Sequence, residues 1–353
     1  MTGNFTGTAE LPTALAFDME ALAREIGGAV PGLDGRARAR KFKGGQSNPT
    51  FLLDTGERQF VLRRRPTGRT LDSAHRIDRE ARVMRALADT PVAVPEILFE
   101  TQTSDVLGSP YYIMEYLDGR IFWDPTMKGA DAEERGAVYG AMIDMLAALH
   151  SVDPASVGLE DFGPEANYFL RQTERWDTQY ASAAGAAALP QMSRLADWLR
   201  DNLPATGRRT IIHGDFRLDN LVFARDSADV LGMIDWELST LGDPLGDLSY
   251  LLLGWRIPLS PDGSPSIASV DPVALGIPTE AEVLDRYARA TQREGVEGLD
   301  TLIVYNLFRL ASILEGVAAR GRQGNASSQR AETFGRMVAP LVAFAIGLSG
   351  LSN

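Results

Sequence analysis

Three side chains suited to phosphoryl transfer follow one another in the second half of the chain: Asp215, Asn220 and Asp235. A hydroxyl group that attacks the terminal phosphate of a nucleotide needs a carboxylate to orient it and to accept its proton. The reaction also needs oxygen ligands on the protein for the Mg²⁺ ion that neutralises the phosphates. Asp215 meets the first need, and Asn220 and Asp235 meet the second. Arg217 stands two residues after Asp215, where a guanidinium group can stabilise the transferred phosphoryl group.

The spacing His-x-Asp-x-x-x-x-Asn, followed by an aspartate at the end of a strand, is the order found in protein kinases. Gly214 and Trp236 replace the Arg and Phe of that pattern, so the chain is not an ordinary protein kinase. The longer segments HGDFRLDNLVF and GMIDWELSTLGDPLGDLSYLL resemble the aminoglycoside phosphotransferase and choline kinase superfamily. Within it, they resemble most the kinase-like domains found beside acyl-CoA dehydrogenases. The resemblance implies a bilobal α+β fold, ATP or GTP as donor, a small-molecule hydroxyl as acceptor, and a His213 that braces the catalytic loop.

The segment KGGQSN of the first lobe joins two predicted strands and contains Gly44, Gly45 and Ser47. Two glycines let backbone amides approach phosphate oxygens without hindrance from a Cβ atom. A glycine pair in a hairpin is also a common structural turn. The position of the segment ahead of the catalytic motif favours a phosphate-binding role.

Arg63 ends the run FVLR, which resembles the strand that carries the nucleotide-binding lysine of kinases. A guanidinium group can hold phosphate oxygens through two nitrogens. Arg63 and Arg65 lie on one face of the strand, and Arg64 lies on the other. The alternative to a phosphate-binding role for Arg63 is a charged edge strand exposed to solvent. By the same resemblance Glu80 pairs with Arg63, and backbone groups of Glu115 and Tyr116 bind adenine.

Two more acidic residues lie near the motif, and the sequence leaves the role of the first undecided and predicts a supporting role for the second. Glu237 could add a metal ligand or pair with an arginine. Asp247 resembles the acid that kinases bury beneath the catalytic loop to bind its backbone. Aromatic residues are more often core than ligand-binding, but four of them are candidates for lining an acceptor pocket: Trp123, Trp236, Trp255 and Tyr305.

The elements that must position these residues fall into two predicted lobes. Residues 1–116 form a nucleotide-covering lobe, with a helix in the amino-terminal segment 1–35 and then a small antiparallel sheet. The five strands and the helix beside them are expected at 37–43, 50–54, 59–64, 96–101, 111–116 and 76–87. Residues 117–353 form a mainly helical lobe that holds the catalytic loop and the acceptor site. Its helices are expected at 132–150, 191–202, 280–292, 302–320 and 332–348, and its strands at 210–212 and 230–235.

Composition restricts the partners and the compartment. The chain has 353 residues, no cysteine and a formal net charge of −12. A strongly acidic surface repels nucleic acids and anionic membranes, so neither is expected as a partner. The amino terminus lacks the pattern of a signal peptide, and no later stretch reads as long enough to cross a bilayer. A cytoplasmic protein is therefore expected.

The charge distribution and the family resemblance favour different acceptors. Residues 1–115 carry fifteen basic and fifteen acidic residues, and the remainder carries twenty basic and thirty-two acidic, so the whole excess lies in the second part. Solubility is one explanation of this excess of negative charge. The same excess favours a cationic alcohol as acceptor, such as an aminoglycoside or a choline-like compound. The resemblance implies a hydroxyacyl thioester instead. Salt screens charge beyond roughly 8 Å, and the basic segment 309–322 can bind an anion locally, so we predict a hydroxyacyl or other non-aminoglycoside metabolite.

Two functions of other classes remain as alternatives. A nucleotide-binding pseudokinase that regulates a partner would have no need for Asp215, Asn220 and Asp235 together. A metal-dependent phosphohydrolase would need a water site in place of an acceptor site. A triad hydrolase is unsupported because the chain lacks a Gly-x-Ser-x-Gly motif.

Overall fold

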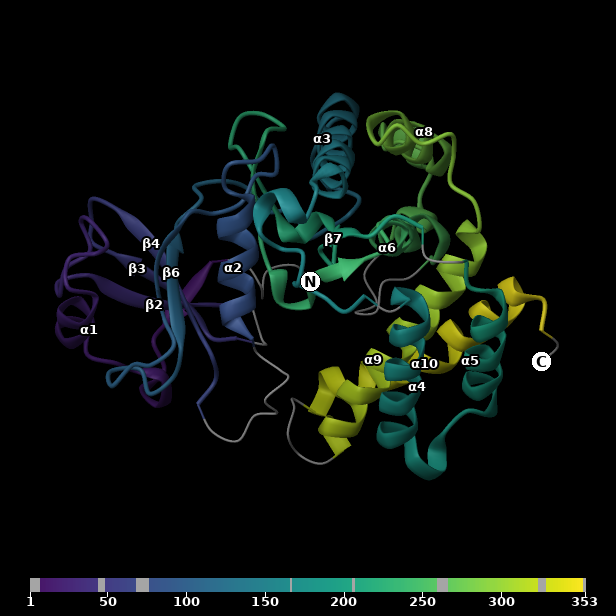
Figure 1. The fold of residues 1–353 in the computed structure, drawn as a ribbon, viewed down its shortest axis with the longest axis horizontal. Helices are drawn as coiled ribbons and strands as arrows, with labels where there is room; N and C mark the ends of the chain where they lie inside the picture. Colours follow the sequence, from purple (N-terminus) through teal and green to yellow (C-terminus); the bar gives the residue numbers. More distant parts are fainter. Residues whose placement is uncertain are drawn as a thin grey trace. The chain divides into compact units, whose positions relative to one another are not determined.

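The structure of the protein is a computed structural model that describes residues 7–43, 48–67, 76–165, 167–204, 207–258, 266–322 and 328–351. The chain divides into two compact units (Figure 1). Unit 1 comprises Met1–Trp123 and Asp219–Ser239, and unit 2 comprises Asp124–Leu218 and Thr240–Asn353. This division differs from the predicted lobes of residues 1–116 and 117–353, because residues 219–239 pack with the first part of the chain.

Unit 1 is built around a six-stranded antiparallel sheet with the strand order β1-β2-β3-β4-β6-β5. The strands are β1 Thr8–Glu10, β2 Arg38–Phe42, β3 Thr50–Asp54, β4 Gln59–Arg64, β5 Ile97–Thr101 and β6 Tyr111–Glu115. The expected five strands are present. The expectation missed β1, a three-residue edge strand without an apolar residue pattern, which pairs with β2 from Thr8 to Glu10.

Two helices accompany this sheet. α1 Met19–Ile26 begins at Asp18, whose carboxylate accepts hydrogen bonds from two amides of the first turn. α2 Ile77–Leu87 packs on β5 and β6 through an apolar face, and its Glu80 is buried on the same side. A buried carboxylate needs a cation beside it, and the partner of Glu80 is described with the site.

A second hairpin in unit 1 follows the catalytic loop along the chain and lies between Asn220 and Asp235 in the sequence. It consists of β8 Leu221–Phe223 and β9 Val230–Met233, followed by the turn Trp236–Leu238. Arg120 N donates to Phe223 O at 2.7 Å, and Met233 N donates to Ala93 O at 2.8 Å. A Cβ atom at Gly119 would stand 2.3 Å from Phe223 O. The close approach that joins the hairpin to unit 1 therefore requires glycine at position 119.

Unit 2 is mainly helical, as predicted. Its helices are α3 Ala132–Ser151, α4 Tyr168–Ala184, α5 Pro190–Asn202, α6 Leu245–Arg256, α7 Pro272–Leu275, α8 Glu280–Ala290, α9 Leu299–Arg322 and α10 Ser328–Ser349. A two-stranded sheet pairs β7 Thr210–Ile212 with β10 Thr240–Gly242. The α+β fold is confirmed, although α4, α6 and α7 were not predicted.

Helix α9 forms the centre of unit 2 and packs on α4, α6 and α10. It runs parallel to α4, because Phe169 contacts Tyr305 with ring centroids 5.2 Å apart and, farther along both helices, Arg322 donates to Ala183 O. Trp176 and Tyr305 are both buried in this packing. The α4–α9 contact therefore aligns the aromatic residues of two helices along one side of the core.

Two helices of the described chain are long and apolar enough to cross a membrane by length and composition, Leu299–Arg322 and the segment Ala331–Ser349. The expectation that no stretch reaches that length was wrong. For α9, 78% of the apolar window is buried inside the protein. This length and composition are those of a core helix as well as of a membrane span.

Candidate active site

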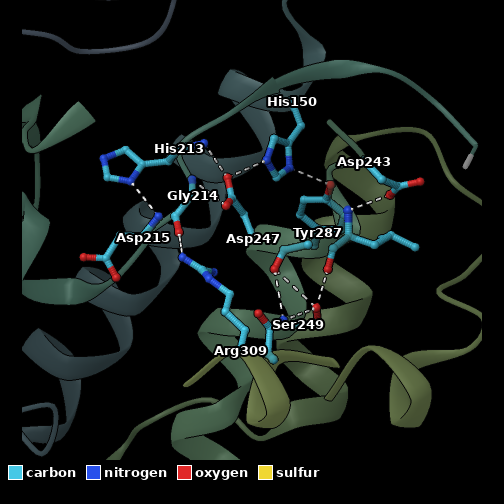
Figure 2. A network of polar contacts seen from close by, with 12 residues as sticks. His150, His213, Gly214, Asp215, Asp243, Asp247, Ser249, Tyr287 and Arg309 are labelled. Atoms are coloured by element: carbon cyan, nitrogen blue, oxygen red, sulfur yellow. Dashed lines mark hydrogen bonds and ion pairs between the residues drawn. The ribbon is translucent and has the colours of Figure 1, made fainter. Parts of the chain in front are cut away.

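The catalytic loop in unit 2 is held by one buried carboxylate. Asp247, at the start of α6, accepts hydrogen bonds from His213 N at 2.6 Å and from Gly214 N at 2.8 Å (Figure 2). Its side chain is 2% exposed. The predicted role of Asp247, to bind the backbone of the catalytic loop, is confirmed by these contacts.

A buried chain of polar groups supports Asp247 in turn. His150, at the end of α3, places Nε2 3.3 Å from Asp247 Oδ2 and Nδ1 2.8 Å from the hydroxyl of Tyr287 in α8. Burial alone would raise the pKa of Asp247, but the hydrogen bond and charge of His150, with the contacts of His213, outweigh burial and hold this pKa below its usual value. Asp247 is therefore an ionised anchor, and His150 has a structural role, because both of its ring nitrogens contact buried side chains.

Asp215 follows this anchored turn as a partly exposed carboxylate. Its amide donates to His213 Nδ1 at 3.2 Å, so His213 braces the loop as the resemblance implies. Its side chain is 23% exposed and lies 3.6 Å from Arg217 Nε. Gly214 has a φ of +84°, a conformation that favours glycine. The turn thus directs Asp215 away from the buried residues that fix the loop.

Two residues that were not predicted to support the loop, Arg309 and Tyr250, reach it from the helices. Arg309 in α9 is buried and donates from Nη2 to Gly214 O, which corrects the expectation that it offers a free cation. Its guanidinium carbon lies 4.8 Å from the ring centroid of Tyr250 in α6. The pKa of Tyr250 is raised, first by burial and then by the charge of Asp215, which lies close to its hydroxyl. Arg309 and Tyr250 therefore add to the support that Asp247 gives the loop.

In unit 1, Arg63 is the centre of a cluster of carboxylates. Its Nε lies 2.8 Å from Glu80 Oε2, and its Nη2 lies 2.7 Å from Asp235 Oδ1 and 3.7 Å from Glu237 Oε2. The predicted pairing with Glu80 is therefore present. Burial alone would lower the pKa of Arg63, but these carboxylates outweigh it and raise the pKa well above its usual value. Arg63 is a permanent cation.

Glu80 is fixed by further donors. Asn48 Nδ2 donates to Glu80 Oε1 at 2.8 Å, and the hydroxyl of Tyr112 donates to Glu80 Oε2 at 3.1 Å. Arg64, on the neighbouring position of β4, instead reaches Leu107 O and lies over the ring of Phe51. Among the arginines at the end of β4, the structure thus brings Arg63 to the acidic cluster.

The two predicted metal ligands stand at the same end of the β8–β9 hairpin. Ile234 N donates to Asn220 O at 2.9 Å, which places Asn220 beside the residue that precedes Asp235. Asp235 has a left-handed backbone, with a φ of +66°. A carboxylate and an amide oxygen are the hard ligands that Mg²⁺ prefers. Within the described ranges no group of three or more His, Cys, Asp or Glu side chains gathers as a metal site, so this pair fits an ion that keeps most of its ligands from phosphate and water.

The structure describes only some of the other residues that were predicted to contact the nucleotide. Gly44, Gly45 and Ser47 lie outside the described residues. Glu115 ends β6, and its amide already donates to Glu96 O at 3.0 Å. A contact of Glu115 with adenine would therefore use its carbonyl group. The contacts of Tyr116 and Glu115 with a nucleotide stay predictions.

Three of the aromatic residues predicted to line an acceptor pocket have contacts with the core of the protein instead. Trp236 is buried in unit 1, where its Nε1 donates to Met233 O at 2.8 Å. Trp255 donates to Pro278 O and packs on Tyr139. These two have structural contacts, and Tyr305 belongs to the α4–α9 core.

The profile of the phosphotransferase enzyme family matches residues 38–302. The chain belongs to this family. The match covers both the Arg63 cluster and the Asp215 loop, and it confirms the predicted resemblance. Phosphotransferase membership is consistent with small-molecule kinase activity.

Curated relatives of this family member are much longer proteins. Acyl-CoA dehydrogenase family member 10 of Mus musculus is 41% identical over 84% of this chain and 28% of its own length. The chain spans less than half the length of the curated relatives that it matches, which carry acyl-CoA dehydrogenase names. The predicted resemblance to kinase-like domains of such proteins is confirmed.

Solved structures agree with the fold. A crystal structure of a candidate aminoglycoside phosphotransferase from Ralstonia eutropha JMP134 is 38% identical, covers 95% of this chain and 99% of its own, and has a TM-score of 0.85. A thermostable mutant aminoglycoside phosphotransferase, solved with AMP-PNP and hygromycin B, is 16% identical, covers 89% of this chain and 96% of its own, and has a TM-score of 0.56. The second likeness concerns the fold alone.

Proposed function

We propose that this phosphotransferase transfers the γ-phosphate of ATP or GTP to a hydroxyl group of a small molecule in a Mg²⁺-dependent reaction. The observation that carries the proposal is the anchored loop of unit 2. Asp247 binds the amides of both His213 and Gly214, and the next residue is the partly exposed carboxylate of Asp215. A rigid backbone around one accessible carboxylate suits a group that must orient a hydroxyl.

Asp215 would accept the hydrogen bond of the acceptor hydroxyl and take its proton as the new O–P bond forms. The bond between the γ-phosphorus and the bridging oxygen breaks in the same reaction, and the nucleoside diphosphate leaves. Tyr250, which lies beside Asp215, would fix the direction of the carboxylate. Arg217 is half exposed beside Asp215, and its guanidinium group would stabilise charge on the transferred phosphoryl group.

The cluster in unit 1 would hold the donor. Arg63 is paired with Glu80 and would bind phosphate oxygens. Asn220 and Asp235 would hold Mg²⁺, which when bound neutralises the charge of the phosphates. Backbone groups of residues 44–47, Glu115 and Tyr116 would contribute the further nucleotide contacts.

For the acceptor, we propose a hydroxyacyl thioester or a related hydroxylated metabolite. Support comes from the relatives, whose names refer to acyl-CoA dehydrogenases and whose chains include an equivalent of this one. The structure solved with hygromycin B is only 16% identical, so an aminoglycoside-type or choline-type kinase is the weaker candidate. A pseudokinase is disfavoured, because the side chains suited to base, metal and phosphate are all retained.

The experiment is an acceptor screen with ATP and with GTP, read by ³¹P NMR for a new phosphate ester and by coupled release of the nucleoside diphosphate. The acceptors are hydroxybutyryl-CoA, choline and kanamycin. We expect ester formation that requires Mg²⁺ and disappears in Asp215→Asn. Diphosphate release that is unaffected by any acceptor and yields only inorganic phosphate would support a phosphohydrolase instead.

A further inference from the structure

Arg309 places a positive charge in the interior of unit 2. It lies on the core helix α9 and is 5% exposed. Its Nη2 donates to Gly214 O (Figure 2), and its guanidinium carbon lies 4.8 Å from the ring centroid of Tyr250 and 5.9 Å from that of Trp176. Within the described ranges, no carboxylate lies within ion-pair distance of Arg309. A buried cation without an anion near it is costly, so the fold must supply a counter-charge.

The aromatic residues around Arg309 are not counter-ions at neutral pH. Three tyrosines, Tyr250, Tyr168 and Tyr305, act on the charge of the guanidinium group. Burial raises the pKa of each of these phenols, so all three are neutral at pH 7. Together with the ring of Trp176 they offer Arg309 dipoles and π faces, but no full negative charge.

The carboxylate that acts on Arg309 is that of Asp215. Gly214, whose carbonyl oxygen accepts the hydrogen bond from Arg309, directly precedes Asp215 in the anchored turn. Burial alone would lower the pKa of Arg309, but the three tyrosines and the charge of Asp215 outweigh burial and raise this pKa above its usual value. Since the tyrosines are neutral at pH 7, Asp215 is the ionised group among these four.

Three other charged or titratable side chains lie beside this turn in unit 2, and none of them balances Arg309. Arg217 is itself a cation, and although it lies 3.6 Å from Asp215 it is half exposed, so that water screens this pair. His213 Nδ1 accepts a hydrogen bond from the amide of Asp215, which requires that this nitrogen carry no proton. Asp247 is an anion, but its oxygens are engaged by two amides of the loop and by an imidazole.

We propose that Asp215 is the counter-ion of Arg309, so that the carboxylate of the catalytic turn also balances a charge in the core of unit 2. The attraction holds the carboxylate in one orientation, and Arg309 is therefore a positioning residue for the group that takes the proton of the acceptor. This positioning role rests on the proposed function, whereas the pairing of charges does not. Groups at active sites often lower the stability of a fold, but here the removal of the carboxylate should be destabilising.

A double-mutant cycle tests the pairing of charges without an assay of activity. Asp215→Asn removes the carboxylate, Arg309→Gln removes the cation and keeps an N–H donor for Gly214 O, and Arg309→Lys keeps the cation. Unfolding in urea is measured for the parent, for each single variant and for each double variant. We expect Asp215→Asn to shift the equilibrium toward the unfolded state by about tenfold in the parent and in Arg309→Lys, and by much less in Arg309→Gln. Should Arg309→Gln fail to fold, the comparison of Asp215→Asn with the parent still decides.

The positioning role is tested by steady-state kinetics with ATP and hydroxybutyryl-CoA. We expect Arg309→Gln to lower kcat by at least about tenfold, because the carboxylate loses its orientation, with little change in the KM for ATP. Arg309→Lys should recover most of this loss, whereas a role limited to the contact with Gly214 O predicts similar values for the two variants. Arg320→Gln, at an exposed arginine of the same helix, is the matched control and should equal the parent in kcat and in stability.

The outcomes for this inference and for the proposed function are distinct. Asp215→Asn as stable as the parent, or an equal effect of Asp215→Asn in Arg309→Gln and Arg309→Lys, would overturn the pairing of charges. Neither result would affect a phosphoryl transfer that depends on Asp215. A kcat of Arg309→Gln equal to that of Arg320→Gln would overturn the positioning role. Conversely, coupling of Asp215 with Arg309 without transfer to any acceptor by the wild-type protein would remove the proposed kinase activity and leave the pairing of charges.

Discussion

Arg63 and Asp235, which lie 172 positions apart in the chain, meet in an ion pair with 2.7 Å between Nη2 and Oδ1. One is the side chain proposed for phosphate and the other is the carboxylate proposed for Mg²⁺. Each neutralises the other in unit 1, and Glu80 shares the same guanidinium group. A nucleotide with its metal must exchange this pairing for phosphate and Mg²⁺ contacts, so we expect nucleotide and metal to bind together.

Removal of Arg63 should strongly destabilise unit 1. Arg63→Met leaves Glu80, which is 1% exposed, without a cation in the interior. An unpaired buried charge of this kind costs about 3–5 kcal/mol. Urea denaturation should show this loss, whereas Arg63→Lys keeps the charge and should lose less. Equal stability of Arg63→Met and the parent would mean that the ion pair does not contribute to folding.

Asp235→Ala should sharply raise the Mg²⁺ concentration needed for nucleotide binding, because a carboxylate is the stronger ligand for a hard cation. Asn220→Ala should have a smaller effect in the same direction. Calorimetric titration with ATP at several Mg²⁺ concentrations measures both. Asp226→Ala, at an exposed acid in the turn of the same hairpin, is the control, and a metal dependence of Asp235→Ala equal to that of the control would exclude the metal role.

Asp215→Asn should reduce kcat by several orders of magnitude and leave the Kd for the nucleotide nearly unchanged. The amide retains the shape of the side chain but cannot accept the hydroxyl proton, and no nucleotide contact is removed. Steady-state kinetics and nucleotide titration of one preparation separate the two effects. A turnover close to that of the wild-type protein would eliminate Asp215 as the base.

Asp247→Asn should destabilise unit 2 by about 2–3 kcal/mol at neutral pH, because the charge that binds two loop amides and His150 is lost. The pKa of Asp247 is lowered in the folded state from an ordinary value of 3.8, so the unfolded chain binds its proton first as the pH falls. The stabilisation is complete above that value and is lost as the pH falls through the lower folded-state pKa. Urea midpoints of parent and variant should therefore differ at pH 7 and converge in acid; a constant difference would show that the charge is not responsible.

Local patterns predicted much of the fold and of the candidate site. The bounds of β3 and β4 agree with the predicted residues, because apolar runs between turn residues indicate buried strands. The pairing of Arg63 with Glu80 and the anchoring by Asp247 followed from the kinase-like motif. The grouping of residues 219–239 with unit 1 was not predicted, because it depends on contacts such as Arg120 with Phe223 that join distant segments.

Helix α4 was not predicted, although its sequence contained a signal. α4 begins after Asn167, whose side chain accepts a hydrogen bond from Leu170 N, and its Phe169, Trp176 and Tyr180 follow the period of a helix. Charged residues on its other faces obscured that period. Helix α6 was missed for the opposite reason, because it is apolar on nearly all sides and periodicity cannot then separate a helix from a strand.

The left-handed backbone of Asp235 and its ion pair act in opposite directions on stability. A non-glycine residue at a φ of +66° costs on the order of 1 kcal/mol, and glycine at this position would relieve it. Glycine would also remove the carboxylate that lies 2.7 Å from Arg63 Nη2 and would leave that buried cation with fewer partners. The backbone conformation of Asp235 is therefore one that its contact with Arg63 stabilises against the local preference of the chain.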